Sequence, residues 1–146
     1  MFELKVIRER KAGYGHSKQF RSSHDIYEMF HDHFLQADRE QFIVLLLDAK
    51  NKLLGFHVVS IGSLTSSIVH PREVFKAVIL GNAAAVIFLH GHPSGDPTPS
   101  QEDIHITNRL RDIGEVLGVR VLDHIIIGDG RYVSFVDDGY VPSRTS

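Results

Sequence analysis

The chain has 146 residues, of which 42% are hydrophobic and 23% charged, and its formal net charge is −2. Such a length and composition indicate one globular domain with a sizeable core, and the charge excludes the strongly basic field of many nucleic-acid-binding proteins. The absence of cysteine excludes disulfides and thiolate metal sites, no apolar run is long enough to predict a membrane helix, and no secretory signal is visible, so we expect a cytoplasmic protein.

Positive charge gathers at the beginning of the chain. Residues 1–22 contain six basic and two acidic side chains, a net charge of +4, which leaves −6 for the remainder. We therefore expect a basic N-terminal arm with a first strand over residues 2–7, followed by a single domain over residues 23–146. Such an arm could contact DNA phosphates or an acidic partner, whereas the alternative is a solvated lead-in without a ligand.

The next three elements follow from the spacing of apolar residues. Residues 22–38 carry an apolar stripe at helical spacing, with Ser23 as the expected N-cap. The continuous apolar run over residues 41–49 predicts a buried strand. Residues 53–62 then predict the returning strand of an antiparallel hairpin.

The second half of the chain alternates strands and helices. A helix is predicted over residues 70–82, because Pro71 suits a first helical position and Gly81 a stop. The remaining expected elements are a strand at 83–92, a helix at 100–118, and strands at 119–128 and 131–138. Hairpins at both ends of this order predict an α/β or α+β fold, with helices sandwiching a mixed β-sheet.

Four polar residues surround the proline-rich loop that follows the strand at 83–92. His90 and His92 are two positions apart, so a strand would point both imidazoles to the same side. Asp103 falls in the first turn of the next helix and could return toward the strand end. Two imidazoles and one carboxylate leave a fourth tetrahedral position for water, which is typical of catalytic zinc.

The same residues have a simpler interpretation as a helix start. Ser100 followed by Asp103 at the third position is a capping pattern, and acidic residues suit the first turn of a helix. A cap requires neither His90 nor His92, however, and it does not explain the rigid loop between them and the helix. The residues by themselves therefore leave both a metal site and a cap open.

The spacing H-x-H, seven residues, then S-x-x-D resembles the metal motif of the JAMM (MPN-plus) metalloprotease superfamily. Here it is formed by His90, His92, Ser100 and Asp103, and the surrounding text from about residue 40 to 137 resembles the JAB domain of the RadC family. The resemblance implies a cytidine-deaminase-like fold and zinc on His90, His92 and Asp103. It also implies that Ser100 stabilises the tetrahedral intermediate of amide hydrolysis.

Three differences from the family pattern affect the expected mechanism. JAMM hydrolases use a glutamate on an upstream strand as the general base, and His57 is the residue we expect at the matching place, where it could relay a proton, approach the metal or fill the site. Glu73 is the nearest upstream carboxylate in sequence, but its place at a helix start is equally compatible with a capping role. Gly91 stands where the family commonly has asparagine. Longer RadC relatives carry a helix-hairpin-helix module before this domain, which is not within these 146 residues, so a DNA role based on that module is not expected.

Other polar residues receive weaker assignments. Asp123 and His124 belong to the family-like text, and either one could support a metal ligand or form a buried hydrogen-bonded pair. We expect His24, His31 and His33 to be surface or boundary residues. His70 and His105 are expected not to bind metal.

Three functions are compatible with these expectations. The first is a zinc-dependent metallopeptidase or isopeptidase that uses Ser100 and His57 on an unidentified peptide or protein substrate, without a membrane partner. The second is a metal-containing, non-hydrolytic module that binds protein or DNA in DNA repair. The third, a metal-dependent nuclease, ranks last because one carboxylate and two imidazoles suit a paired-metal site poorly.

Overall fold

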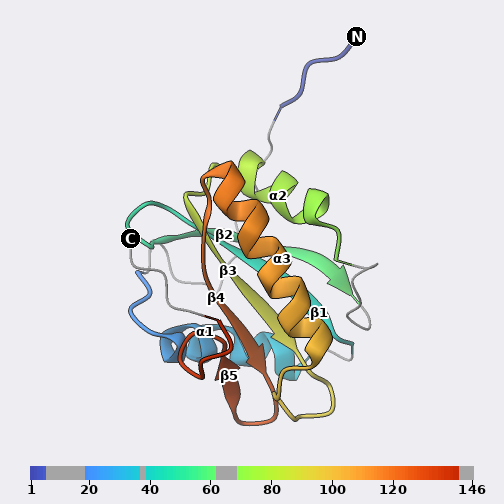
Figure 1. The fold of residues 1–146 in the computed structure, drawn as a ribbon, viewed down its shortest axis with the longest axis vertical. Helices are drawn as coiled ribbons and strands as arrows, with labels where there is room; N and C mark the ends of the chain where they lie inside the picture. The colour runs from blue at the N-terminus through green and yellow to red at the C-terminus, as the bar shows by residue number, and fades with distance from the viewer. Residues whose placement is uncertain (6–18, 37–38, 62–68, 142–146) are drawn as a thin grey trace.

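The computed structural model describes residues 1–5, 19–36, 39–61 and 69–141. In this part of the chain, three helices pack on a five-stranded mixed sheet (Figure 1). The elements are α1 (Ser23–Leu35), β1 (Gln41–Leu47), β2 (Leu53–Ile61), α2 (Pro71–Leu80), β3 (Ala85–Gly91), α3 (Gln101–Leu117), β4 (Arg120–Ile127) and β5 (Tyr132–Ser134). The strand order is β2-β1-β3-β4-β5, in which β3 and β4 are parallel and the other neighbours antiparallel. The predicted mixed α/β fold is confirmed.

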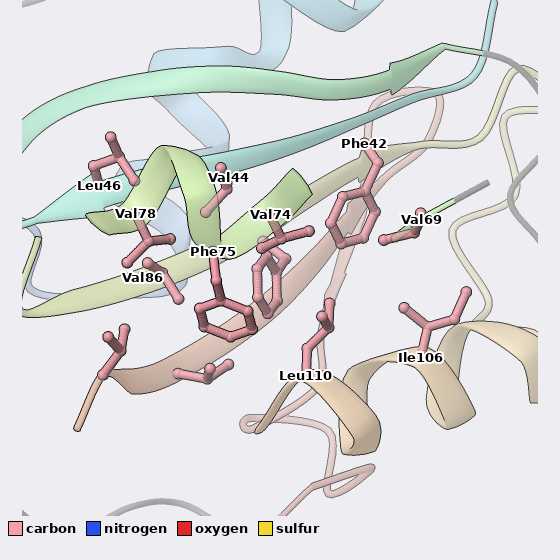
Figure 2. Close-up of a cluster of buried hydrophobic side chains, with 13 residues drawn as sticks. Phe42, Val44, Leu46, Val69, Val74, Phe75, Val78, Val86, Ile106 and Leu110 are labelled. Atoms are coloured by element: carbon pink, nitrogen blue, oxygen red, sulfur yellow. The ribbon is translucent and has the colours of Figure 1, made fainter. Parts of the chain in front are cut away.

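The two faces of the sheet bury different hydrophobic clusters. On β1 and β3 the even-numbered side chains face α2 and α3, as Figure 2 shows for Phe42 and Val44, whereas odd-numbered ones such as Ile43 and Leu89 face α1. Strand alternation explains this division, because successive side chains point to opposite faces. The near-continuous apolar run of β1 is therefore accounted for by helices on both faces.

A bulge in β4 changes which residues face α3. Val86 pairs with Val121, but Ile87 pairs with Asp123, so Leu122 is an extra residue on β4. Val121 lies in the cluster under α3, and after the bulge it is the even-numbered residues, beginning with His124, that return to that side. The bulge thereby places His124 on the same side of the sheet as His90.

The helix boundaries largely agree with the expected capping signals. Pro71 begins α2, Gly81 follows its end, and Gly118 closes α3 in a left-handed conformation with φ of 73°. One cap was predicted wrongly: Ser22, not Ser23, is the N-cap of α1, and its side chain accepts a hydrogen bond from the backbone N–H of Asp25. Two adjacent serines gave the sequence pattern no means of choosing between them.

The beginning of the chain differs from the expected arm and strand. Residues 2–5 have no regular secondary structure, and residues 6 and 7 of the predicted strand lie outside the described residues. Packing begins before residue 23, because Gln19 forms an isolated bridge with Lys52 and Phe20 is buried in the cluster under α1. Most of the basic arm, residues 6–18, lies outside the described part.

The last strand is shorter than the predicted 131–138. β5 ends at Ser134, and a turn over residues 135–139 follows, in which the Phe135 N–H still donates to the His124 carbonyl of β4 while later backbone groups bond within the turn or to side chains. Asp123 Oδ1 accepts the N–H groups of His124 and Val136, and Asp138 accepts the N–H of Ser134. The Ser134 hydroxyl donates to the other oxygen of Asp123 at 2.6 Å. Asp123 therefore holds the segment after β5 against β4.

We expect Asp123→Asn to be neutral or stabilising and Asp123→Ala to be destabilising. Burial raises the pKa of Asp123, although three hydrogen bonds oppose it. A raised folded-state pKa means that stability falls as the pH rises from the usual value near 3.8 through the folded-state pKa. Asparagine does not ionise, so this loss of stability with pH disappears. It also keeps the hydrogen bonds of Asp123, since the Ser134 hydroxyl can accept a hydrogen bond from the asparagine amide instead of donating one. Alanine leaves two N–H groups unpaired, which costs about 1–3 kcal/mol.

Urea unfolding of the wild type and both variants at acidic and neutral pH measures these effects. The free energy of unfolding of Asp123→Asn minus that of the wild type should increase as the pH rises. An asparagine variant as unstable as the alanine variant at neutral pH would contradict this role of Asp123.

Candidate metal centre

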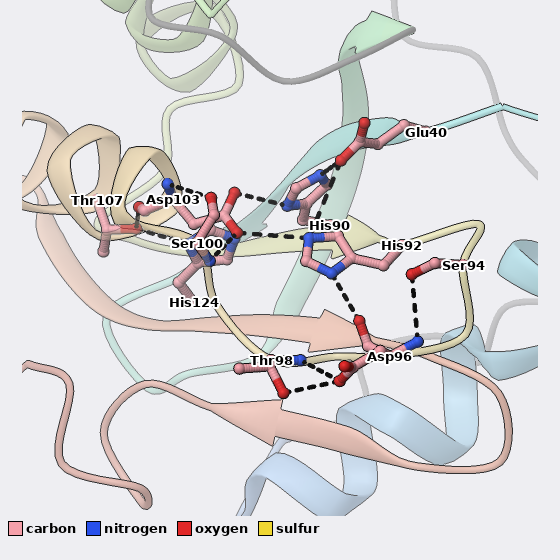
Figure 3. Close-up of polar contacts among 10 residues, drawn as sticks. All are labelled: Glu40, His90, His92, Ser94, Asp96, Thr98, Ser100, Asp103, Thr107 and His124. Atoms are coloured by element: carbon pink, nitrogen blue, oxygen red, sulfur yellow. Dashed lines mark hydrogen bonds and ion pairs between the residues drawn. The ribbon is translucent and has the colours of Figure 1, made fainter.

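Three segments meet at one end of the sheet because of the strand order. The C-terminal end of β3 and the N-terminus of α3 lie there, since α3 connects two parallel strands and must start where β3 ends. β1 runs antiparallel to β3 with Phe42 opposite His90, so the residues just before β1 reach the same end. Figure 3 shows side chains from all three segments converging there.

His90 is completely buried on the side of the sheet that faces α3. Its Nε2 lies 2.6 Å from Glu40 Oε1, and its Nδ1 lies 3.4 Å from Asp103 Oδ1 without a hydrogen-bond partner. Because a carboxylate only accepts, a neutral His90 donates from Nε2 and leaves an unprotonated Nδ1 in the interior. A buried nitrogen lone pair next to a carboxylate is well suited to bind a cation.

His92 is held in one orientation by the loop that follows it. Its Nδ1 donates to the backbone carbonyl of Asp96 at 2.8 Å, which leaves Nε2 directed toward Asp103 Oδ2 at 3.4 Å and Glu40 Oε1 at 3.9 Å. Burial lowers the pKa of His92, but hydrogen bonds to Asp103 and Asp96 and the two carboxylate charges outweigh it, so the pKa is raised. Nε2 therefore faces negative charge that a proton or a metal cation can balance.

Asp103 contacts both histidines and also caps α3. Its Oδ2 accepts the backbone N–H of Ser100 at 2.8 Å, and Ser100 Oγ accepts the N–H of Asp103 at 3.1 Å. Burial raises the pKa of Asp103, but the hydrogen bonds from His92 and Ser100, and the attraction of a positive charge when His90 is protonated, hold the pKa well below its usual range. The cap and the contact with the histidines thus coexist, and the carboxylate is ionised.

Ser100 lies at the helix start with an exposed side chain. Its oxygen accepts from Asp103, so its hydroxyl hydrogen is still able to donate toward a ligand. This geometry is compatible with the oxyanion role that the resemblance implies.

Glu40 is the residue at this site that the sequence analysis did not select. It lies one residue before β1 and contacts both His90 and His92, and the three side chains each place a ligating atom within 4.8 Å of the others. The feature of the sequence that could have identified Glu40 was its position directly before the strand predicted at 41–49. Its significance depended on β1 pairing with β3, which the sequence pattern does not reveal.

The two residues expected as general base are not part of this group. His57 is exposed on β2 opposite Val44, and β1 lies between β2 and β3. Glu73 lies on α2 and forms an ion pair with Lys76. Of the two upstream glutamates Glu40 and Glu73, Glu40 is the one that contacts the two histidines.

The donor set fits a divalent cation. Two imidazoles and nearby carboxylates are ligands that zinc prefers, and nitrogen–oxygen separations of about 3.4 Å are expected across a tetrahedral ion with bonds of about 2.0–2.2 Å. His90 and His92 each lie 3.4 Å from an oxygen of Asp103. With the unpartnered His90 Nδ1, these contacts show that the residues are suitable for such an ion.

A buried chain of hydrogen bonds connects the backbone of Asp103 to Thr107 and His124. The Thr107 hydroxyl donates to the Asp103 carbonyl at 2.7 Å and lies 2.6 Å from His124 Nδ1. Since that hydroxyl has one hydrogen, His124 Nδ1 is the donor in the second bond. Burial, followed by the charge of His90, lowers the pKa of His124 to about 3, so this ring is neutral.

We expect Thr107→Val to lower the free energy of unfolding by about 1–3 kcal/mol, because the His124 Nδ1–H loses its buried acceptor. Thr107→Ser keeps the hydroxyl and should cost about 0.8 kcal/mol for the missing methyl group. Thermal or urea unfolding of both variants gives the comparison. Equal losses would show that the hydroxyl makes no net contribution.

Comparison with known proteins gives the family of the chain. Residues 20–140 match the family model described as the RadC-like JAB domain. This chain belongs to the RadC family. It is 51% identical over 142 residues to a UPF0758 protein of Syntrophotalea carbinolica, covering 94% of this chain and 63% of that protein. It is 57% identical over 121 residues to a UPF0758 protein of Pelobacter propionicus, covering 83% and 53%.

A third relative, a UPF0758 protein of Methanosarcina acetivorans, is 55% identical over 120 residues, which cover 82% of this chain and 52% of that protein. The chain thus spans between about half and two thirds of the length of these RadC relatives. The names of these relatives do not state an activity. In the described residues, no helix has both the length and the apolar character needed to cross a bilayer.

Proposed function

We propose that this RadC-family domain is a zinc-dependent hydrolase of the JAMM metallopeptidase or isopeptidase type. The observation that carries the proposal is the convergence of His90, His92 and Asp103, in which His90 Nδ1 and His92 Nε2 each lie 3.4 Å from an oxygen of the Asp103 carboxylate. These three residues would hold the ion. Bound there, Zn²⁺ would supply Lewis-acid chemistry and lower the pKa of water.

In this mechanism Glu40 transfers protons. Its Oε1 lies within 4 Å of the Nε2 atoms of both histidines, so a carboxylate is present next to the place where water and the scissile carbonyl would meet. Glu40 accepts a proton from water as the water oxygen bonds to the carbonyl carbon. It then delivers that proton to the amide nitrogen as the carbon–nitrogen bond breaks.

Ser100 stabilises charge on the carbonyl oxygen in the same mechanism. Its hydroxyl is exposed at the start of α3 and its oxygen is positioned by the N–H of Asp103. A hydrogen bond from this hydroxyl strengthens as the oxygen becomes negative, which lowers the barrier rather than only improving binding.

Metal content and peptide cleavage test this proposal directly. Protein purified without chelator is assayed for zinc by mass spectrometry and then incubated with a peptide mixture and with an isopeptide-linked substrate. We expect about one zinc per chain and metal-dependent appearance of new amine termini. Protein that neither carries nor takes up stoichiometric zinc would contradict the proposal.

We infer that DNA is a second candidate partner, through the basic arm at residues 1–22. The support is its net charge of +4 in a chain that is otherwise acidic. This non-hydrolytic function in DNA repair predicts binding that weakens steeply with salt and disappears when the arm is removed. Binding that is independent of salt would count against it.

A further inference from the structure

A hollow of about 370 Å³ lies beside His92, around the end of the sheet from Asp103. Its walls come from the end of α1 and the residue before Glu40, from the loop after His90, and from the turn between β4 and β5. The lining includes Phe34, Leu35, Arg39, Ser94, Gly95 and Asp129. Its size lies in the range typical of small-ligand sites. Because His92 lines it, the hollow adjoins the proposed reaction centre.

Gly91 and Phe34 define one wall of this hollow. A Cβ atom built at Gly91 would lie only 2.4 Å from Phe34 Cδ1, so the ring occupies the space that a side chain at position 91 would need. The residue between the two histidines is therefore glycine for a steric reason. The phenylalanine from α1 thereby shapes the space next to His92.

The opposite wall is formed by backbone in close contact. The N–H of His92 donates to the Ile127 carbonyl at 3.0 Å, and the N–H of Asp129 donates to the Gly95 carbonyl at 2.9 Å. A Cβ atom at Gly128 would lie 2.3 Å from the Gly95 oxygen. These contacts fix the loop and the β4–β5 turn together, so the hollow is already formed in the structure.

Arg39 contributes a positive charge to the lining of the hollow, which favours a negatively charged ligand. Arg39 directly precedes Glu40, at a bend in the chain just before β1. Glu40 contacts the histidines, and Arg39 lines the hollow. Arg39 is exposed, and among the described residues it forms no ion pair.

The other charged side chain of the hollow belongs to Asp129. Asp129 lies on the β4–β5 turn, against Gly95, whereas Arg39 enters the lining from the segment before β1. A ligand whose carboxylate binds Arg39, and whose amide bond lies near Glu40, keeps its negative charge on the positive residue of the hollow and away from Asp129. The reverse orientation would place a ligand carboxylate against Asp129.

We propose that this hollow is the subsite for the substrate residue next to the scissile amide, and that Arg39 selects a carboxylate on that residue. The inference rests on the proposed hydrolase function for its orientation, but the binding itself does not require catalysis. The carboxylate belongs either to an acidic side chain or to the end of a peptide chain. Arg39 forms a charge-assisted hydrogen bond with it in both cases.

NMR titration of the full chain, with and without added Zn²⁺, tests the subsite. The probes are acetyl-Ala-Glu-Ala-amide, its Gln counterpart, and acetyl-Ala-Ala with either a free carboxylate or an amide at its end. The amide signals of Gly91, Gly95 and Gly128 report on the hollow, and Gly118 at the far end of α3 is the reference. We expect shifts at the three lining glycines and about fivefold tighter binding of a carboxylate peptide than of its neutral counterpart.

Arg39→Gln should bring that binding ratio to about one, whereas Arg109→Gln, an exposed arginine on α3, should leave it unchanged. Equal binding of charged and neutral peptides, absence of shifts at the glycines, or a ratio that survives Arg39→Gln would each overturn the subsite. If the acidic peptide binds as expected but zinc-loaded protein never hydrolyses it or any other peptide, the proposed hydrolase function fails while the subsite stands.

Discussion

Glu40→Gln is expected to reduce peptide hydrolysis by about 10²–10⁴-fold while zinc content stays near one per chain. Glutamine keeps the size and an oxygen that can accept from His90, but it cannot take up a proton from water. His90, His92 and Asp103 are unchanged in this variant, so the ion retains its proposed ligands. Initial rates and bound zinc measured on the same preparation separate proton transfer from metal binding.

Two matched controls accompany the Glu40 variant. Glu73→Gln alters a partly exposed glutamate on α2, and His57→Gln alters an exposed side chain on β2. Both positions were expected from the sequence to supply the base, and both should leave the rate within about twofold of the wild type, because neither contacts the histidines. Loss of zinc from Glu40→Gln would instead make Glu40 a metal ligand, in agreement with its distance from the two imidazoles.

Asp103→Asn is expected to weaken zinc binding by more than about 100-fold, since loss of groups that only support metal ligands already costs ~10–100-fold. The Asp103 carboxylate is ionised because hydrogen bonds and nearby histidines overcome its burial and hold its pKa low. Asparagine removes the charge but keeps an oxygen for the Ser100 N–H. We therefore expect only a small loss of helix stability, about 0.3–1 kcal/mol.

Asp112→Asn is the control for this experiment, because Asp112 is exposed on α3 and outside the site. Zinc affinity is measured by competition with a chromophoric chelator, and helix content by circular dichroism. An Asp103→Asn protein that folds and binds zinc as tightly as Asp112→Asn would contradict the assignment of Asp103 as a ligand.

Local signals identified most of the fold. The apolar runs of β1 and β3, the hairpin after β1, and the proline and glycine that bound α2 are set by residues close together in sequence, where periodicity and backbone preference decide. β5 was overestimated because the chain turns after Ser134, where Asp123, eleven residues earlier, accepts from the Ser134 hydroxyl and from the Val136 N–H. A contact between a side chain and a segment further along the chain leaves no pattern in the neighbouring sequence from which it could be predicted.

The sequence by itself identified the two histidines, the serine and the aspartate as candidate site residues. One strand, one loop and one helix start follow each other directly, and this succession sets the spacing of the four residues. Only the tertiary structure added the fifth residue. Glu40 reaches His90 because β1 pairs antiparallel with β3, whereas His57 is kept away by the same pairing, with β1 lying between β2 and β3. Strand order depends on the packing of the whole sheet, and therefore no short stretch of residues records which carboxylate completes the site.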